Sequence, residues 1–347
     1  MDGTQQAMLR FPWEEPPAPG EAIEVADGIL WIRAPLPMRL DHVNCYALDE
    51  GDHWTLIDTG MNTGAGREAW EVVLAGPLAS KPVGRIVITH HHPDHIGMLG
   101  WFAERFDVEI WSTRLGYMMA RMMTLDVQEN PSPAQVTFRR RSGQPEEGVQ
   151  AYAREPAWKF SKVVAPIPIG FRDIREGTTM RLGGRDWHVH FGHGHAPSHA
   201  VFWSEDVVLA GDQIIPGISS NIGVWALEPE ANPLADWLES CERFRNLAGT
   251  SDALILPGHK LPFHGASFRL TQLIDNHVHA LDRIMAALAD GPKTAAQVFT
   301  PVFKREIGGT QYGLALAESV AHMNYLHQAG RVTRTLVDGA WVYERAE

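Results

Sequence analysis

Cysteine is scarce in this chain of 347 residues, which contains only Cys45 and Cys241. Such sparse use excludes a disulfide scaffold and is typical of a reducing compartment. Long apolar runs are also missing, because no stretch approaches the roughly 20 residues that a membrane-spanning helix needs. The segment from Met1 to Glu21 is rich in proline and lacks the basic start and apolar run of a signal peptide. We therefore expect a cytoplasmic protein with no membrane partner.

Positive charge is in short supply as well. The 30 lysines and arginines are outnumbered by 42 acidic residues, which gives a formal net charge of -12. A polyanion is repelled by such a chain unless a local basic patch compensates, so the composition disfavours a nucleic-acid partner. The remaining composition, with 44% hydrophobic and 21% charged residues, is ordinary for a globular enzyme, and the length suggests about two domains.

Histidine, by contrast, is abundant, and its densest cluster is Thr89–His95, with the spacing His-x-His-x-Asp-His. A β-branched run, Gly84–Thr89, precedes the cluster and a segment of helical composition, Ile96–Phe106, follows it, so the histidines are predicted on a strand-to-helix turn. Imidazole and carboxylate ligands without thiolate suit zinc, with iron or manganese possible. The alternative is a charged surface loop that happens to be rich in histidine.

Other segments each place a metal-ligand type of residue at the end of an apolar run. They are Trp54–Ile57 followed by Asp58-Thr59-Gly60, Gly194–His199, Val207–Asp212 and Leu254–His259. With the histidine cluster they stand in the order of the motifs of the metallo-β-lactamase superfamily, which the chain resembles over about residues 23 to 265. The segment Gly194–His199, for example, is similar to the Gly-His-Thr-Pro-Gly-His of that family.

The resemblance implies a dinuclear site with two divalent ions, most simply Zn²⁺. In this arrangement His90, His92 and His195 hold one ion, Asp94, His95 and His259 hold the other, and Asp212 bridges them. Two cations that share a solvent oxygen lower its pKa and supply a bridging hydroxide as nucleophile. Asp94 is also the candidate catalytic residue, because it could orient that oxygen or carry a proton to the leaving group. Asp58 is expected to fix the cluster through hydrogen bonds, and His199 to lie behind the ligands, with a substrate contact as its alternative.

The fold expected from the resemblance is a mixed α/β (α+β) domain, an αββα sandwich. Short apolar or alternating runs predict strands, and two stretches predict helices. The predicted strands are Ile29–Ile32, Asn44–Leu48, Trp54–Ile57, Met180–Leu182, Trp187–Phe191, Ala200–Trp203 and Val207–Ala210, and the predicted helices are Arg67–Leu74 and Gly97–Arg105.

Four segments make up the expected domain organisation. They are an N-terminal extension (1–21), the catalytic domain (22–265), a helical or loop insertion near the pocket within it (112–178), and a winged-helix-like domain (266–347).

In the insertion, Tyr117, Met118 and Met122 are candidates for an adaptable apolar substrate pocket, although a methionine-rich helix is more often core. Lys260 could reach a substrate carboxylate or phosphate, or simply be an exposed lysine. Arg139–Arg141 could attract a phosphate-bearing substrate, or be a solvated charge run.

The C-terminal domain is predicted from three helices, Phe268–Leu288, Thr294–Phe299 and Leu314–Gln328, followed by an Asp338-Gly339 hairpin. This winged-helix pattern raises the possibility of nucleic-acid binding, but the third helix contains no lysine or arginine. We therefore expect packing, a pocket lid or dimerisation, and hence a possible homodimer.

Taken together, the sequence predicts a metal-dependent hydrolase, glyoxalase II-like, that cleaves a thioester or a lactone or other ester of a small, partly apolar substrate. The alternative within the superfamily is a metal-dependent phosphodiesterase or nuclease, and a non-catalytic binding protein is a third possibility. A β-lactamase is disfavoured, because the best-known zinc β-lactamases lack the bridging aspartate and are exported. Glutathione is not an expected carrier, since the tail does not resemble the glutathione-recognising domain of glyoxalase II.

Overall fold

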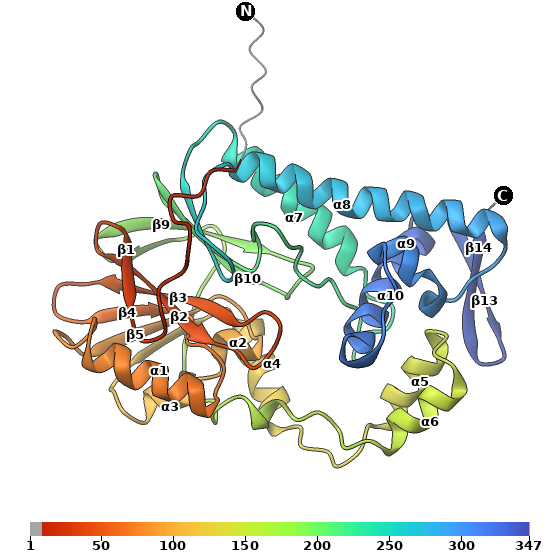
Figure 1. Cartoon of the computed structure of the whole chain (residues 1–347), viewed down its shortest axis with the longest axis horizontal. Helices are drawn as coiled ribbons and strands as arrows, with labels where there is room; N and C mark the ends of the chain where they lie inside the picture. Colours follow the sequence, from red (N-terminus) through yellow and green to blue (C-terminus); the bar gives the residue numbers. More distant parts are fainter. Residues whose placement is uncertain (1–8, 347) are drawn as a thin grey trace, which may run out of the picture. The chain divides into compact units, whose positions relative to one another are not determined.

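The computed structural model describes residues 9–346 and divides them into two compact units (Figure 1). Unit 1 comprises the described residues up to Val127, Lys159–Ser220 and Phe244–Leu270. Unit 2 comprises Gln128–Trp158, Asn221–Arg243 and the described residues from Thr271 onward. This division differs from the consecutive domains 22–265 and 266–347, because unit 2 takes up two segments that precede residue 265.

Unit 1 is built on two sheets. The seven-stranded sheet has the order β1 (Ala22–Ala26), β2 (Ile29–Pro35), β3 (His42–Asp49), β4 (Trp54–Ile57), β5 (Val83–Ile88), β6 (Glu109–Ser112) and β7 (Arg172–Asp173). The five-stranded sheet has the order β12 (Leu254–Pro257), β11 (Val207–Gly211), β10 (His199–Trp203), β9 (Arg185–Gly192) and β8 (Thr179–Leu182). All the strands predicted from the sequence are present, most of them a few residues longer.

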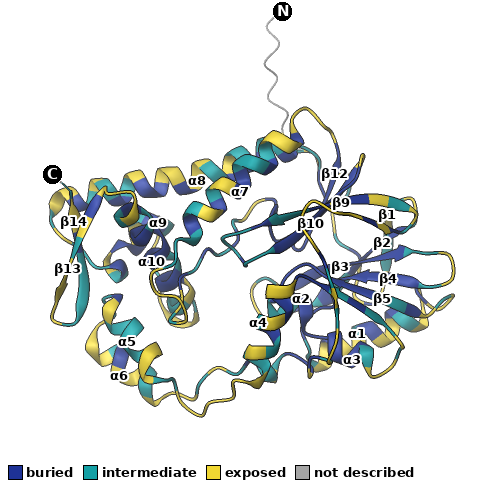
Figure 2. Ribbon diagram, turned by 180° about the vertical axis from the view of Figure 1, so that it is seen from behind, coloured by how far each residue is buried: buried dark blue, intermediate teal, exposed yellow. Residues whose placement is uncertain are grey.

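Large apolar side chains hold the layers of unit 1 together. One buried cluster joins Trp31 and Tyr46 of the first sheet to Trp187 and Phe202 of the second, so the two sheets pack face to face. A second cluster covers the other face of the seven-stranded sheet with helices α1 (Gly64–Ala75) and α3 (Leu99–Ala103). The strands are accordingly among the most buried parts of the chain (Figure 2).

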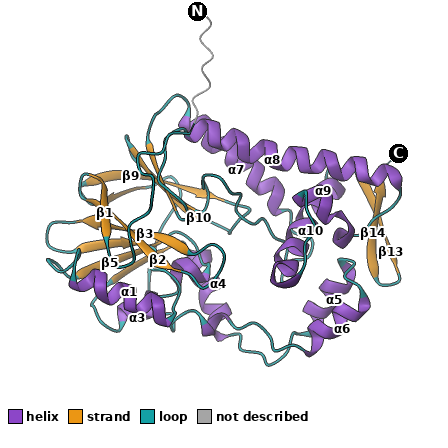
Figure 3. Ribbon diagram, in the orientation of Figure 1, coloured by secondary structure: helices purple, strands orange, loops and turns teal. Residues whose placement is uncertain are grey.

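The outer face of the second sheet is covered by the C-terminal end of α7 (Pro233–Ala248), where Phe244 stacks on Trp203 of β10 with ring centroids 6.1 Å apart. Helix, sheet, sheet and helix therefore follow one another, and the expected αββα sandwich is confirmed (Figure 3). The predicted helix Gly97–Arg105 is shorter than expected. Helix α2 (Pro93–Ile96) ends before Gly97, although Gly97 keeps helical dihedral angles, and α3 begins at Leu99. Gly97 lies against backbone atoms of Gly60 and Asn62 that leave no room for a side chain.

Strand direction brings the motif loops to one place. Strands β4, β5 and β6 are parallel, so Asp58 and the Thr89–His95 segment leave the seven-stranded sheet at the same edge. In the second sheet β11 and β12 are parallel, so Asp212 and His259 also follow strand ends at one edge. The antiparallel β9–β10 turn, which contains His195, lies at that edge too.

The rest of unit 1 packs around this frame. Helix α4 (Arg114–Leu125) and a 3₁₀ turn, Phe160–Lys162, lie beside the first sheet. In the N-terminal extension, residues 1–8 fall outside the described part, whereas Arg10 pairs with His264 and Trp13 packs edge-on to Trp31. No helix among residues 9–346 combines the length and apolar character needed to cross a membrane.

Unit 2 is mainly helical. Its elements are α5 (Pro133–Arg141), α6 (Glu146–Arg154), α7 up to Arg243, α8 (Ala266–Ala287) from Thr271, α9 (Phe299–Phe303), α10 (Tyr312–Gln328), the 3₁₀ turns Leu288–Asp290, Ala295–Val298 and Gly309–Gln311, and the hairpin β13 (Val332–Val337) and β14 (Ala340–Arg345). The first and third predicted C-terminal helices and the Asp338-Gly339 turn are confirmed, and both turn residues have positive φ, +49° and +84°. The second predicted helix is a 3₁₀ turn that continues into α9.

The three arginines at the end of α5 have intramolecular partners in unit 2. Arg139 lies 4.2 Å from the ring centroid of Tyr152, and Arg140 donates two hydrogen bonds to Glu146 at 2.9 and 3.0 Å. Arg141 lies 5.8 Å from the ring centroid of Trp341. These contacts favour a structural role for the run over a phosphate-binding one.

Candidate metal centre

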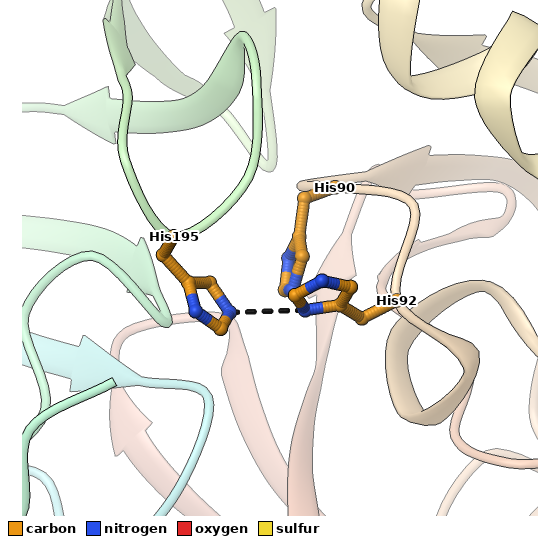
Figure 4. Close-up of side chains that lie close together, drawn as sticks. All are labelled: His90, His92 and His195. Carbon is orange, nitrogen blue, oxygen red and sulfur yellow. Dashed lines mark hydrogen bonds between the residues drawn. The ribbon is translucent and has the colours of Figure 1, made fainter. Parts of the chain in front are cut away.

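Three imidazole rings converge at the first half of the predicted site (Figure 4). His90 and His92 come from the turn after β5, and His195 comes from the turn between β9 and β10. His92 Nδ1 lies 3.0 Å from His90 Nε2 and 3.0 Å from His195 Nε2. The three residues form a group whose ligand atoms have the spacing that a shared metal ion requires.

The second half of the site is built from Asp94, His95 and His259, which form another group of this kind. Asp94 Oδ2 lies 3.2 Å from His259 Nε2 and 3.7 Å from His95 Nε2. Asp212 lies between the two halves, because its Oδ2 is 3.4 Å from His195 Nε2 and 3.4 Å from His259 Nε2. All seven side chains predicted as ligands are thus brought together.

The donor set fits divalent cations. His95 Nε2 and Asp212 Oδ1 are buried and have no hydrogen-bond partner among the described residues, although they lie 3.4 Å apart. Such orphaned groups are costly unless a ligand satisfies them. Five imidazoles and two carboxylates without thiolate form a set typical of zinc, which manganese or iron also accepts.

The two halves of the site differ in the charge of their side chains. Burial lowers the pKa of His90 and of His92 well below the ordinary value, and neighbouring histidines add to this, so both rings are neutral. Burial also opposes the charged form of His259, but the carboxylates of Asp212 and Asp94 outweigh it and raise its pKa to about 10. Burial would raise the pKa of Asp212, yet His259 and His95 hold it well below the ordinary value. The carboxylate half therefore attracts positive charge.

Further side chains fix the ligands in place. Asp58, in the left-handed region with φ +58°, accepts hydrogen bonds from the Thr89 backbone and from His95 Nδ1, at 2.8 and 2.7 Å. Thr89 Oγ1 donates to Asp58 at 2.7 Å and lies 3.0 Å from His90 Nδ1. His199 stacks on His90 with centroids 4.5 Å apart, and its Nε2 accepts from the Asp212 backbone at 3.0 Å.

Some supporting groups were not anticipated from the sequence. The carbonyl of His42 accepts from His259 Nδ1 at 2.8 Å, which orients that ring. The amide of Asn44 donates to the carbonyls of Pro257 and Lys260 at 2.9 and 2.7 Å, so it clamps the turn that carries His259. Both come from β3, and the one local signal was two polar residues that interrupt an otherwise apolar strand.

The predicted pocket residues have different surroundings. Tyr117 is buried, with its ring stacked on Phe171 at 4.2 Å and its hydroxyl donating to the Pro168 carbonyl, which describes a packing residue. Met118 and Met122, on the same helix α4, are 52% and 45% exposed. Lys260 is exposed and adopts a left-handed conformation with φ +70°, and its carbonyl is held by Asn44.

The chain matches known protein families over most of its length. Residues 38–259 match the metallo-beta-lactamase superfamily, and residues 281–346 match the metallo-beta-lactamase-like C-terminal domain. The chain is 28% identical over 325 residues to the probable metallo-hydrolase YqjP of Bacillus subtilis, covering 88% of this chain and 94% of that one.

Solved structures are similar over nearly the whole length. A beta-lactamase domain protein from Burkholderia ambifaria has a TM-score of 0.87 and 36% identity, with 97% of each chain covered. A metallo-beta-lactamase family protein from Thermus thermophilus has a TM-score of 0.76 and 30% identity, covering 93% of this chain and all of that one (100%).

Proposed function

This chain belongs to the metallo-β-lactamase superfamily and is a metal-dependent hydrolase, and on this premise we propose that it uses two divalent ions to cleave a thioester, lactone or other ester. The proposal rests chiefly on one observation, the position of Asp212, whose Oδ2 lies at the same 3.4 Å distance from His195 and from His259. A carboxylate between two ligand groups is the arrangement that a bridging ligand requires.

In the proposed site His90, His92 and His195 hold one ion, Asp94, His95 and His259 hold the second, and Asp212 is shared. When bound, the two ions supply a nucleophilic oxygen near neutral pH and polarise the carbonyl to be attacked. The natural ion is proposed to be zinc, because imidazole nitrogen predominates.

Asp94, Asp58 and His199 have distinct roles in this proposal. The side chain of Asp94 is partly exposed, at 18%, against 8% for Asp212 and 3% for His259. A carboxylate that is both in the cluster and partly accessible to solvent can orient the attacking oxygen or pass a proton to the leaving group. Asp58 and His199 keep the ligands in position through the hydrogen bonds described above.

For the substrate, we propose a small molecule with an apolar part. Helix α4 begins just after β6, and its Gly116 lies next to the backbone of His91, so the helix starts beside the histidine cluster. The exposed Met118 and Met122 on this helix are adaptable apolar contacts for an acyl chain.

We also propose that the C-terminal part of unit 2 is a winged-helix-like domain that does not bind nucleic acid. Helices α8, α9 and α10 followed by a hairpin support the likeness. Against nucleic acid stands α10, which has no lysine or arginine and buries much of its surface, including Leu316, Val320 and Met323. A recognition helix needs an exposed, basic face.

The test combines metal analysis with a substrate panel of acyl thioesters, lactones, a cephalosporin and a phosphodiester. We expect about two metal ions per chain and turnover of thioesters or lactones that a chelator abolishes and added zinc restores. Cleavage of the phosphodiester alone would replace this proposal with a nuclease-type function. Turnover unaffected by metal removal would contradict it.

A further inference from the structure

A second group of metal-ligand side chains lies inside unit 2, on elements that contribute nothing to the centre in unit 1. His277 belongs to α8, and Glu318 and His322 belong to α10. One ligand atom from each of the three lies within 4.8 Å of the others. The two histidines are almost completely buried, with exposures of 1% and 0%.

We propose that His277, Glu318 and His322 form a separate binding site for one divalent cation of the zinc type, which ties α8 to α10 inside unit 2. The proposal does not depend on the function proposed for unit 1. Two imidazoles and one carboxylate are a set that zinc accepts, with water as the remaining ligand.

Spacing supports the proposal. Glu318 and His322 are four residues apart on one helix, so their side chains lie on the same face, one turn apart. His277 Nδ1 lies 3.2 Å from His322 Nε2. Two nitrogens bound tetrahedrally to one zinc at about 2.0–2.1 Å are roughly 3.3 Å apart, so the rings need almost no movement to share an ion. The same close approach occurs in unit 1, between His92 and His195 at 3.0 Å.

The orientation of His322 also fits a ligand. Its Nδ1 lies 2.8 Å from the backbone carbonyl of Glu318, so this nitrogen carries the proton and Nε2 keeps a lone pair that faces His277. Ligating histidines are usually fixed by a carbonyl or carboxylate in this way. His259 in unit 1 is held likewise by the carbonyl of His42, at 2.8 Å.

Glu318 supplies the charge that a cation needs. Its Oε2 accepts a hydrogen bond from the Asn221 side chain at 2.7 Å, which holds the carboxylate beside the histidines. Burial raises the pKa of Glu318 to about 7, against the effect of that hydrogen bond. Burial lowers the pKa of His322 to about 4, so its ring is neutral at physiological pH. A buried carboxylate beside two imidazole nitrogens forms a donor set that a cation completes.

The competing explanation is a hydrogen-bonded histidine pair without metal, in which His277 Nδ1 donates to His322 Nε2. The two explanations differ in metal content, which can be measured on the full chain. The zinc held in unit 1 is removed from the count by a background variant, His90→Ala with His92→Ala, Asp94→Ala and Asp212→Ala, which leaves at most two ligands in either half of that centre and no change in unit 2.

In this background the protein is equilibrated with Zn²⁺, dialysed and analysed for zinc. We expect about one zinc per chain, and close to none after the further change Glu318→Gln or His322→Gln. Glu318→Gln keeps the shape of the side chain and can still accept from Asn221. His279→Gln, an exposed histidine two residues from His277 on the same helix, is the matched control and is expected to keep the zinc.

Equal zinc content in Glu318→Gln and His279→Gln would overturn the proposal in favour of the hydrogen-bonded pair. A second readout needs no change in unit 2: Zn²⁺ must raise the Tm of the background variant, because it binds the folded state only. An unchanged Tm would also overturn the proposal. Loss of hydrolysis in the background variant bears on unit 1 alone, so failure of the two proposals can be told apart.

Discussion

Gly258 precedes the proposed ligand His259 and lies so close to the proposed metal centre that a methyl group has no space there. A Cβ at this position would be 2.2 Å from Asp212 Oδ1 and 2.8 Å from His95 Cε1. Its φ is not in the left-handed region, so the requirement for glycine is steric and comes from ligands that are distant in sequence.

We expect Gly258→Ala to lower hydrolysis or metal affinity by about 10- to 100-fold, the range found when groups that position ligands are changed. The reason is displacement of the Asp212 carboxylate. Metal content and kcat/KM should be measured together. Gly64→Ala is the control, because nothing lies within 4 Å of its added Cβ. Equal metal affinity and rates in the two variants would contradict the steric argument.

Asp94 allows a sharper test of the two-ion site. Asp94→Asn keeps the size of the side chain and removes the charge that faces His95 and His259. We expect loss of about one metal ion and a fall in turnover of roughly 100-fold, with the fold retained. Elemental analysis, circular dichroism and steady-state kinetics check the three parts. Wild-type rates would exclude Asp94 from the working site.

At the scale of single elements, α4 exposes more large apolar side chains than the other helices described in unit 1. It packs Tyr117 and Ala120 into the core but leaves Leu115, Met118, Met122 and Leu125 exposed, each by 45% or more. Apolar side chains at helical spacing on an exposed face point to contact with an apolar molecule.

We expect Met118→Ser with Met122→Ser to lower kcat/KM for a long-chain acyl substrate by about tenfold relative to a short-chain one, since each buried methylene contributes about 0.8 kcal/mol. Chain-length profiles of wild type and variant provide the measurement. Val278→Ser, an exposed position on α8, is the control. A parallel shift of the whole profile would argue against an acyl contact.

The Arg140–Glu146 ion pair is one of the contacts that connect α5 and α6. Hydrogen bonds from Arg140 and then Gln150 lower the pKa of Glu146 to about 2 from an ordinary value of 4.5. Because the folded-state pKa is depressed, the pair stabilises this connection above pH 4.5, and the contribution is lost as the pH falls toward 2. Glu146 is exposed and Arg140 is partly exposed, so the effect on overall stability is small.

For Arg140→Gln we expect the pKa of Glu146 to return toward 4.5. The change is best followed by NMR titration of the glutamate side-chain carbons. Arg154→Gln, in the last turn of α6, serves as control. An unchanged Glu146 titration in Arg140→Gln would show that other groups set this pKa.

At the scale of the molecule, the proposed metal centre connects the two sheets of unit 1. Its ligands follow β5 of the seven-stranded sheet and β11 and β12 of the five-stranded sheet. Ions bound there stabilise the folded state only, and they also cancel the repulsion among buried carboxylates.

We expect a chelator to lower the Tm by roughly 5–10 °C, which corresponds to about 2.7 kcal/mol of linkage for an ion present at 100 times its Kd. Calorimetry with and without chelator, followed by zinc addition, is the measurement. The variant lacking His90, His92, Asp94 and Asp212 should respond less. An identical Tm under both conditions would show that the centre adds nothing to stability.

Much of this protein was determined by its sequence alone. The strands, the α1, α8 and α10 helices, the Asp338-Gly339 hairpin and the ligand motifs are local patterns, in which an apolar run or turn residue specifies its own conformation. The predicted ligands lie close together because each stands shortly after such a run, so strand direction carries it to the same edge of the sandwich.

Only the tertiary structure decided which residues that are distant in sequence lie close together in space. It assigned Gln128–Trp158 and Asn221–Arg243 to unit 2, placed Asn44 beneath the His259 turn, and gave Tyr117 a packing role. It also brought His277 to Glu318 and His322, which carry no shared motif. Such proximity results from the packing of whole elements, and packing is decided by the summed burial of many side chains rather than by any local spacing.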